Sequence, residues 1–107
     1  MSYKQRIQKT YSDRGAVNVL SRKLNKSGLK DYAQFSYLYP KIDEEVGKKR
    51  LVIGGYMTQY FVSDWIPEEE KFTEKHIQDV LNDMIPSIVN RLGEKDAQEF
   101  KEKVVQT

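Results

Sequence analysis

Cysteine is missing from this chain of 107 residues. Its absence excludes disulfide bonds, a thiolate nucleophile and any zinc site built on cysteine ligands. Long apolar runs are missing as well, and a helix needs about 20 predominantly apolar residues to cross a bilayer. No segment resembles a secretory signal, so we expect a cytoplasmic protein that inserts into no membrane.

Signatures of catalysis and cofactor binding are also scarce. Histidine occurs once, at His76, so a nucleophilic triad has a single candidate base. No Gly-Lys-Ser or Gly-Lys-Thr sequence marks a phosphate-binding loop. Asp79 and Asp83 follow His76 at helical spacing, but a lone histidine among carboxylates is commonly solvated rather than bound to metal. We therefore expect no enzyme, no cofactor and no metal ion.

The sequence does contain one strongly periodic stretch, residues 73–92. Its apolar side chains recur every three or four positions, which predicts a helix with one buried face. They are Ile77, Val80, Leu81, Met84, Ile85, Ile88, Val89 and Leu92. Pro86 removes one backbone hydrogen bond, yet the period is unchanged across it, so we predict one bent helix, with two helices as the alternative. Thr73 is the expected N-cap, and Gly93 suits the helix end.

Two further helices are predicted on the same grounds. Residues 13–26 carry an apolar stripe and end just before Gly28, a suitable left-handed cap. Residues 94–106 carry a narrower stripe and form the expected C-terminal helix. Residues 2–11 fit a helix and a strand, and we favour the helix.

The middle of the chain predicts strands. Residues 31–39 alternate in character and are rich in aromatic side chains, which indicates a strand closed by Pro40. Gly54-Gly55 stands between two apolar runs and predicts a two-residue hairpin turn, because such turns need positive φ. One long strand with a glycine bulge is the alternative.

The expected fold is α+β, with a single domain over residues 1–107. A small antiparallel sheet of two or three strands, with a hairpin at Gly54-Gly55, is packed by three helices. These are the N-terminal helix, the long helix bent at Pro86 and the C-terminal helix.

Charge is distributed unevenly along the chain, although the net charge is only +2. Residues 1–50 hold 12 basic and 5 acidic side chains, whereas residues 51–107 hold 6 and 11. All 7 tyrosines lie at or before Tyr60. This asymmetry indicates a nucleic-acid face, separate faces for protein partners, or two halves that neutralise each other in the fold.

The basic half supports direct nucleic-acid binding. Its cations can neutralise phosphates, and tyrosines can stack on bases if their sheet face is open. The candidates are Arg14, Arg22, Lys23, Lys26, Lys30, Tyr37 and Tyr39. Packing of the tyrosine rings against a small sheet is the favoured alternative.

The acidic half supports a protein-interaction or inhibitor module, and we place this hypothesis first. An acidic surface can dock on the basic groove of a nucleic-acid-handling protein, and complementary charge speeds association. The candidates are Glu68, Glu69, Glu70, Glu74, Asp79 and Asp83. Phage-encoded antagonists of host defence are similar in these general terms. We expect a protein partner, and a monomer or a homodimer.

The predicted order of helix, strands and helix over residues 13–92 resembles the double-stranded-RNA-binding domain, and Gly54-Gly55 lies where that family turns between strands. The resemblance is one of arrangement. That family carries a lysine cluster at the start of its last helix, on the phosphates. This chain has acidic residues 68–70 before its long helix, so we do not assign it to that family.

Overall fold

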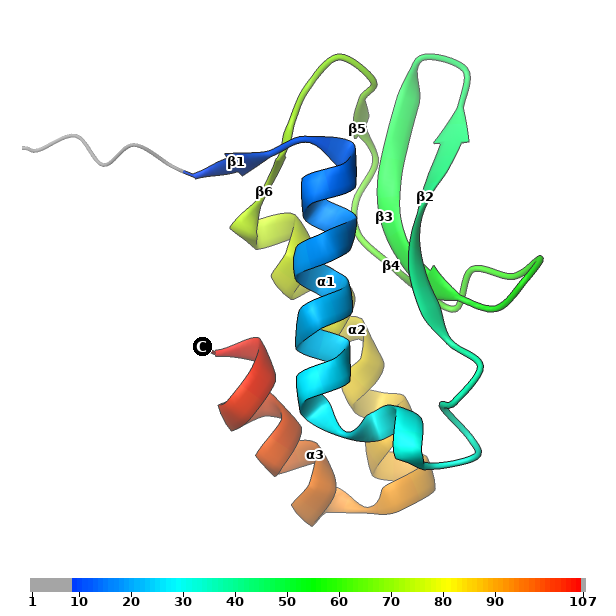
Figure 1. Cartoon of the computed structure of the whole chain (residues 1–107), viewed down its shortest axis with the longest axis vertical. Helices are drawn as coiled ribbons and strands as arrows, with labels where there is room; N and C mark the ends of the chain where they lie inside the picture. The colour runs from blue at the N-terminus through cyan, green and yellow to red at the C-terminus, as the bar shows by residue number, and fades with distance from the viewer. Residues whose placement is uncertain (1–8, 107) are drawn as a thin grey trace, which may run out of the picture.

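The computed structural model describes residues 9–106, in which helices pack against small antiparallel sheets (Figure 1). In chain order the elements are β1 (Thr10–Tyr11), α1 (Asp13–Ser27), η1 (Leu29–Asp31), β2 (Tyr39–Glu45), β3 (Lys48–Gly54), β4 (Phe61–Val62), β5 (Ile66–Pro67), β6 (Phe72–Thr73), α2 (Glu74–Leu92), α3 (Glu94–Phe100) and η2 (Lys101–Val105). α1 contacts β2 on one side and η2 on the other, while α2 contacts β3, β4 and α3. The predicted α+β class is confirmed.

α1 confirms the predicted N-terminal helix closely. Ser12 Oγ accepts a hydrogen bond from the backbone N–H of Gly15 (3.1 Å), and Asp13 places a negative charge at the positive end of the helix. The helix ends before Gly28, whose φ of 78° is left-handed as predicted. Its buried side chains are Ala16, Leu20 and Leu24.

The main sheet is built on β3. β2 pairs with it antiparallel across the turn at Val46 and Gly47, with Lys41 opposite Val52. β4 and β5 pair in succession with the other edge of β3, so together they serve as one interrupted edge strand. A second, smaller sheet joins β1 to β6. The predicted small antiparallel sheet is therefore present.

The predicted two-residue hairpin at Gly54-Gly55 is wrong. β3 continues through Gly54, and the chain pairs with it again only at β4, where Ile53 lies opposite Phe61. A Cβ on Gly54 would lie 1.9 Å from the carbonyl oxygen of Thr58. Glycine is needed at this position for a close approach of two backbones rather than for a turn conformation.

Residues 31–39 do not form the predicted strand. Asp31 completes η1, residues 32–38 continue in bends and turns, and Tyr39 begins β2, which runs through Pro40 instead of stopping there. Proline is tolerated because β2 is an edge strand. Phe35 and Leu38 are both buried, and the N–H of Leu38 donates to the carbonyl of Phe35. Burial at a spacing of three residues is a turn period, not strand alternation.

α2 continues through Pro86 as one helix, which confirms the one-helix interpretation. Pro86 is exposed, and so is Asn82, whose carbonyl loses its helical partner, so water can replace the missing bond. The N-cap at Thr73 and the terminal Gly93, with a φ of 100°, agree with prediction. The fully buried side chains of α2 are Ile77, Val80, Leu81, Met84 and Ile88, while Ile85, Val89 and Leu92 are partly buried.

The C-terminal helix begins with α3 and ends in the π-helical turn η2. The backbone N–H of Gln106 donates to the carbonyl of Lys101, five residues earlier (3.0 Å). The wider turn allows two adjacent side chains, Val104 and Val105, to be buried together.

The helix predicted for residues 2–11 is wrong at Thr10 and Tyr11, which form β1. The part of this prediction on residues 2–8 lies outside the described residues. The hydroxyl of Tyr11 donates to Glu74 Oε1 (2.8 Å), which ties β1 to the first turn of α2.

Ile88 and Ile85 form a matched pair for testing which face of α2 is buried. We expect Ile88→Ala to lower the free energy of unfolding by about 2–5 kcal/mol, because it leaves a cavity in the core. Ile85→Ala removes the same atoms from a partly buried position and should cost less. Urea denaturation followed by circular dichroism measures both, and equal losses would contradict this orientation of α2.

Candidate protein-interaction surface

The six acidic residues predicted as an interaction surface are divided between two environments. Residues 68–70 are exposed in the connection between β5 and β6, and the N–H of Glu68 donates to the carbonyl of Gly47 (3.1 Å). The three acids on α2 have internal partners. Their bonds are Glu74 to the Tyr11 hydroxyl (2.8 Å), Asp79 to the Lys75 ammonium (2.9 Å) and Asp83 to the backbone N–H of Val62 (3.1 Å). The structure therefore brings three of the acidic candidates into hydrogen bonds within the chain and leaves residues 68–70 exposed in a separate connection.

The basic candidates of α1 form an exposed stripe with one exception. Arg14, Arg22 and Lys26 are exposed, at spacings of eight and four residues on one face of the helix. Lys23 does not belong to this stripe, because its Nζ donates a hydrogen bond to the backbone carbonyl of Val104 in η2 (3.3 Å). Lys30 lies in η1 and is partly buried.

Ion pairs in the described part of the chain join residues that are both in the basic half or both in the acidic half. Five ion pairs within residues 9–106 each join two residues of the same half. They are Lys48–Glu45, Lys49–Asp13 and Arg50–Asp43 in the first half, and Lys75–Asp64 and Lys75–Asp79 in the second. These pairs give no support to the interpretation that the two halves neutralise each other by contact.

A different surface surrounds the loop of residues 55–60, which follows β3 and projects to the right in Figure 1. Large apolar side chains are exposed around this loop. They are Tyr37 (52% exposed), Tyr39 (40%), Tyr56 (85%), Met57 (75%) and Tyr60 (49%), and we call this set the tyrosine surface. The favoured prediction of packed tyrosine rings is therefore wrong for Tyr37 and Tyr39.

Specific contacts hold the loop in one shape. Lys41 Nζ donates to the carbonyl of Gly55 (2.6 Å), and the N–H of Gly55 donates to Thr58 Oγ1 (3.1 Å). The N–H of Tyr60 donates to the carbonyl of Ile53 in β3 (3.1 Å). These hydrogen bonds fix the backbone on both sides of the exposed tip, which consists of Tyr56 and Met57.

A hollow of ≈ 150 Å³ lies beside the tyrosine surface. Phe35, Leu38 and Phe61 line it together with Tyr37, Tyr60 and Arg91. The two tyrosine rings meet edge to face, with centroids 6.1 Å apart. Hydrogen bonds from Thr58 and Tyr37 lower the pKa of Tyr60 below 10.0, and the positive charge of Arg91 acts in the same direction. The pKa of Tyr37 is raised because its hydroxyl donates to Tyr60 and because it is partly desolvated.

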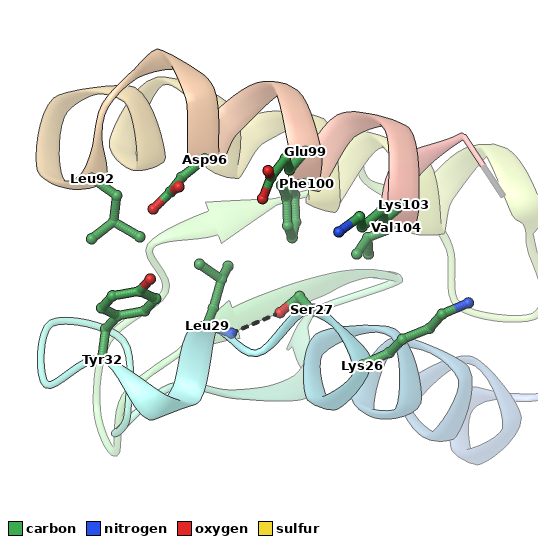
Figure 2. A pocket seen from close by; sticks show the side chains of 10 residues that line it. All are labelled: Lys26, Ser27, Leu29, Tyr32, Leu92, Asp96, Glu99, Phe100, Lys103 and Val104. Atoms are coloured by element: carbon green, nitrogen blue, oxygen red, sulfur yellow. Dashed lines mark hydrogen bonds between the residues drawn. The ribbon is translucent and has the colours of Figure 1, made fainter.

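A second hollow of ≈ 170 Å³ separates the end of α1 from the α3–η2 segment (Figure 2). Leu29 and Tyr32 point into it from one side, and Leu92 and Phe100 lie opposite. Its charged lining residues are Lys26, Asp96, Glu99 and Lys103. Because both signs are present, this hollow favours no particular ligand charge.

The sheet face opposite the helices is occupied by its own cation–ring contacts. Lys48 Nζ and the Arg50 guanidinium lie 4.5 Å and 4.2 Å from the centroid of the Trp65 ring. Arg50 also pairs with Asp43 (2.9 Å). These groups satisfy one another, so we place no candidate site on this face.

His76 is a capping residue rather than a simply solvated one. Its Nδ1 accepts a hydrogen bond from the backbone N–H of Thr73 (2.9 Å), and its ring meets Phe72 edge to face at 5.7 Å. Burial lowers the pKa of His76 below 6.5. Within residues 9–106 no group of three or more histidine, aspartate or glutamate side chains gathers as metal ligands would.

No family model, curated protein or solved structure matches the chain. The arrangement that resembles the double-stranded-RNA-binding domain is also incomplete, because residues 31–38 form no strand. In the described part of the chain, no helix has the length and hydrophobicity needed to cross a bilayer. A function therefore has to be argued from this chain's own surface.

We expect His76 to make stability depend on pH. Its folded-state pKa lies below 6.5, so the unfolded chain binds the proton more readily. The stabilisation is complete above about pH 6.5 and is lost as the pH falls through the folded-state pKa. His76→Gln is the matched variant, because glutamine can also cap from this position but does not titrate. Denaturation at about pH 7.5 and about pH 5 should show a larger acid-induced loss in the wild type; equal losses would contradict the assignment.

Proposed function

We propose that this chain is a non-catalytic binding protein that attaches to a protein partner through the tyrosine surface. The observation that carries the proposal is the exposure of five large apolar side chains around one ordered loop. Exposed apolar patches with a polar rim are typical of interaction sites. Tyrosine, methionine and arginine are also the residue types enriched where protein partners meet.

The sizes of the hollows favour surface contact over an enclosed substrate site. The two hollows described above hold ≈ 150 and ≈ 170 Å³, and another, lined by charged side chains that include Asp13, Glu45 and Lys48, holds ≈ 260 Å³. Small-molecule and cofactor sites commonly occupy about 300–1,000 Å³. Hollows of this size accept single side chains of a partner more readily than a substrate.

A protein partner is expected as before, but its contact residues are those of the tyrosine surface instead of the acidic candidates. The tyrosine surface lies beyond the C-terminal end of β3 and has Lys41 and Arg91 at its edges. The acidic run of residues 68–70 lies at the other end of β3, because Glu68 bonds the carbonyl of Gly47. A partner that binds the tyrosine surface therefore meets aromatic rings and positive charge rather than the acidic run.

Removal of the exposed tip tests the proposal. We expect Tyr56→Ser combined with Met57→Ser to weaken partner binding about tenfold or more, because truncation of interface hot spots commonly costs about 2 kcal/mol or more. The partner is first identified by chemical crosslinking and mass spectrometry. Its affinity for the wild type and the variants is then measured by calorimetry. The melting temperature should not fall, since both side chains are largely in water.

Two control variants sharpen this test. Val46→Ser removes a fully exposed apolar side chain at the opposite end of β3 and should leave the affinity unchanged. Glu68→Gln, Glu69→Gln and Glu70→Gln together test the acidic run. Loss of binding in this triple variant, with full affinity in the Tyr56/Met57 variant, would transfer the function to the acidic surface.

Direct nucleic-acid binding is the second candidate function, and the exposed stripe of Arg14, Arg22 and Lys26 favours it. Under the protein-binding proposal, replacing all three by alanine should not change the affinity for a labelled single-stranded oligonucleotide at about 0.15 M salt. Fluorescence anisotropy over a salt series measures this. Tighter binding by the wild type, with a logarithmic salt slope steeper by about 2, would assign phosphate contacts to the stripe.

A further inference from the structure

The hollow beside the tyrosine surface combines an apolar floor with one charged wall. Phe35, Leu38 and Phe61 form the floor and are each buried. Arg91, in the last turn of α2, is the one charged side chain among its lining residues. Ser87 lies one helical turn earlier and lines the same hollow.

Arg91 lacks an acidic partner within the described residues. No carboxylate of residues 9–106 forms an ion pair with its guanidinium. Its charge nevertheless acts on the hollow, because it favours the ionised forms of both Tyr37 and Tyr60. A cation without a counter-charge at the edge of a hollow attracts an anion from outside the chain.

The hydroxyl groups add to this preference. Tyr60 lines the hollow, and its hydroxyl is a possible hydrogen-bond donor. The hydroxyl of Ser87 is a further donor on the wall of the hollow. Donors and positive charge therefore surround a floor that is apolar.

We propose that this hollow binds the side-chain carboxylate of an acidic peptide segment in the protein partner. The inference rests on the proposed function and names the chemistry that the partner presents beside the tyrosine surface. A guanidinium fork matches a carboxylate in a bidentate pair. The volume of ≈ 150 Å³ suits one side chain, and the floor of Phe35, Leu38 and Phe61 can contact its methylene groups.

The single cation favours a carboxylate over a phosphate. Sites that recognise phosphorylated motifs use clusters of arginine, because the phosphate group carries close to two charges. Arg91 is the one charged residue among those that line the hollow. One guanidinium can balance one carboxylate but leaves a phosphate undercompensated.

Two capped peptides test the inference on the full chain. One has the sequence Ala-Leu-Glu-Leu-Ala, and the other carries glutamine in place of glutamate. Heteronuclear NMR titration follows the backbone amides of Tyr60, Phe61, Ser87 and Arg91. We expect the glutamate peptide to shift these signals and to bind about tenfold more tightly than the glutamine peptide, because its hydrogen bonds are charge-assisted.

Arg91→Gln should abolish the preference for glutamate. Arg22→Gln is the matched control, because it removes the same charge from the exposed outer face of α1 and should keep the preference. Both arginines are exposed, and a denaturation curve for each variant verifies that it folds.

Three results would overturn the inference. The first is equal affinity of the wild type for both peptides, and the second is a glutamate preference that persists in Arg91→Gln. The third is inorganic phosphate that shifts the same signals at lower concentration than the glutamate peptide. Full partner affinity in Arg91→Gln, together with loss in the Tyr56/Met57 variant, would refute the carboxylate site and leave the proposed function standing.

Discussion

The buried face of α2 is the constraint on which the rest of the structure depends. Its side chains meet the sheet, α1 and the C-terminal helix, and each fully buried one stabilises the fold by about 1.5–3 kcal/mol before entropy is counted. The same helix fixes the candidate surface. Asp83 bonds the backbone of Val62 in β4, where the loop of residues 55–60 returns to the sheet. Arg91 lies eight residues later on the same helix and lines the hollow beside that loop.

The helices could be predicted from the sequence, and so could the presence of a small antiparallel sheet, but not which residues pair in it. A helix repeats its burial every 3.6 residues within one continuous segment, so α1 and α2 are visible in local spacing. A strand is defined by a partner elsewhere in the chain, which local alternation does not reveal. Residues 31–39 alternate aromatic and polar side chains, yet Phe35 and Leu38 are buried through turns. Gly54-Gly55 has the composition of a hairpin turn, but glycine is required at Gly54 because the loop brings the backbone of Thr58 against it, and the glycine pair alone does not distinguish these two causes.

The candidate site was predicted only in part, for a related reason. Tyr37 and Tyr39 are candidates for base stacking in the sequence, with packed rings as the favoured alternative, and both belong to the exposed tyrosine surface. A two-residue turn at Gly54-Gly55 would place Tyr56 and Met57 in the second strand of a hairpin, so the pattern does not reveal that they form the tip of a loop. The acidic candidates rest on charge density along the chain, which cannot show that Glu74 accepts a hydrogen bond from the Tyr11 hydroxyl. The number of charged side chains can be counted from a sequence, whereas the hydrogen-bond partner of each one depends on the fold.

The loop of residues 55–60 is longer than the sheet requires. β3 and β4 are antiparallel neighbours, and two residues are enough to join such strands. The added residues bury little of their own, because Tyr56 and Met57 are mostly in water. These residues are nevertheless held in place by Lys41, by the hydroxyl of Thr58 and by a close backbone contact at Gly54. Ordering an exposed apolar tip costs conformational entropy without a gain in the core, and the proposed partner would offset this cost by covering the tip.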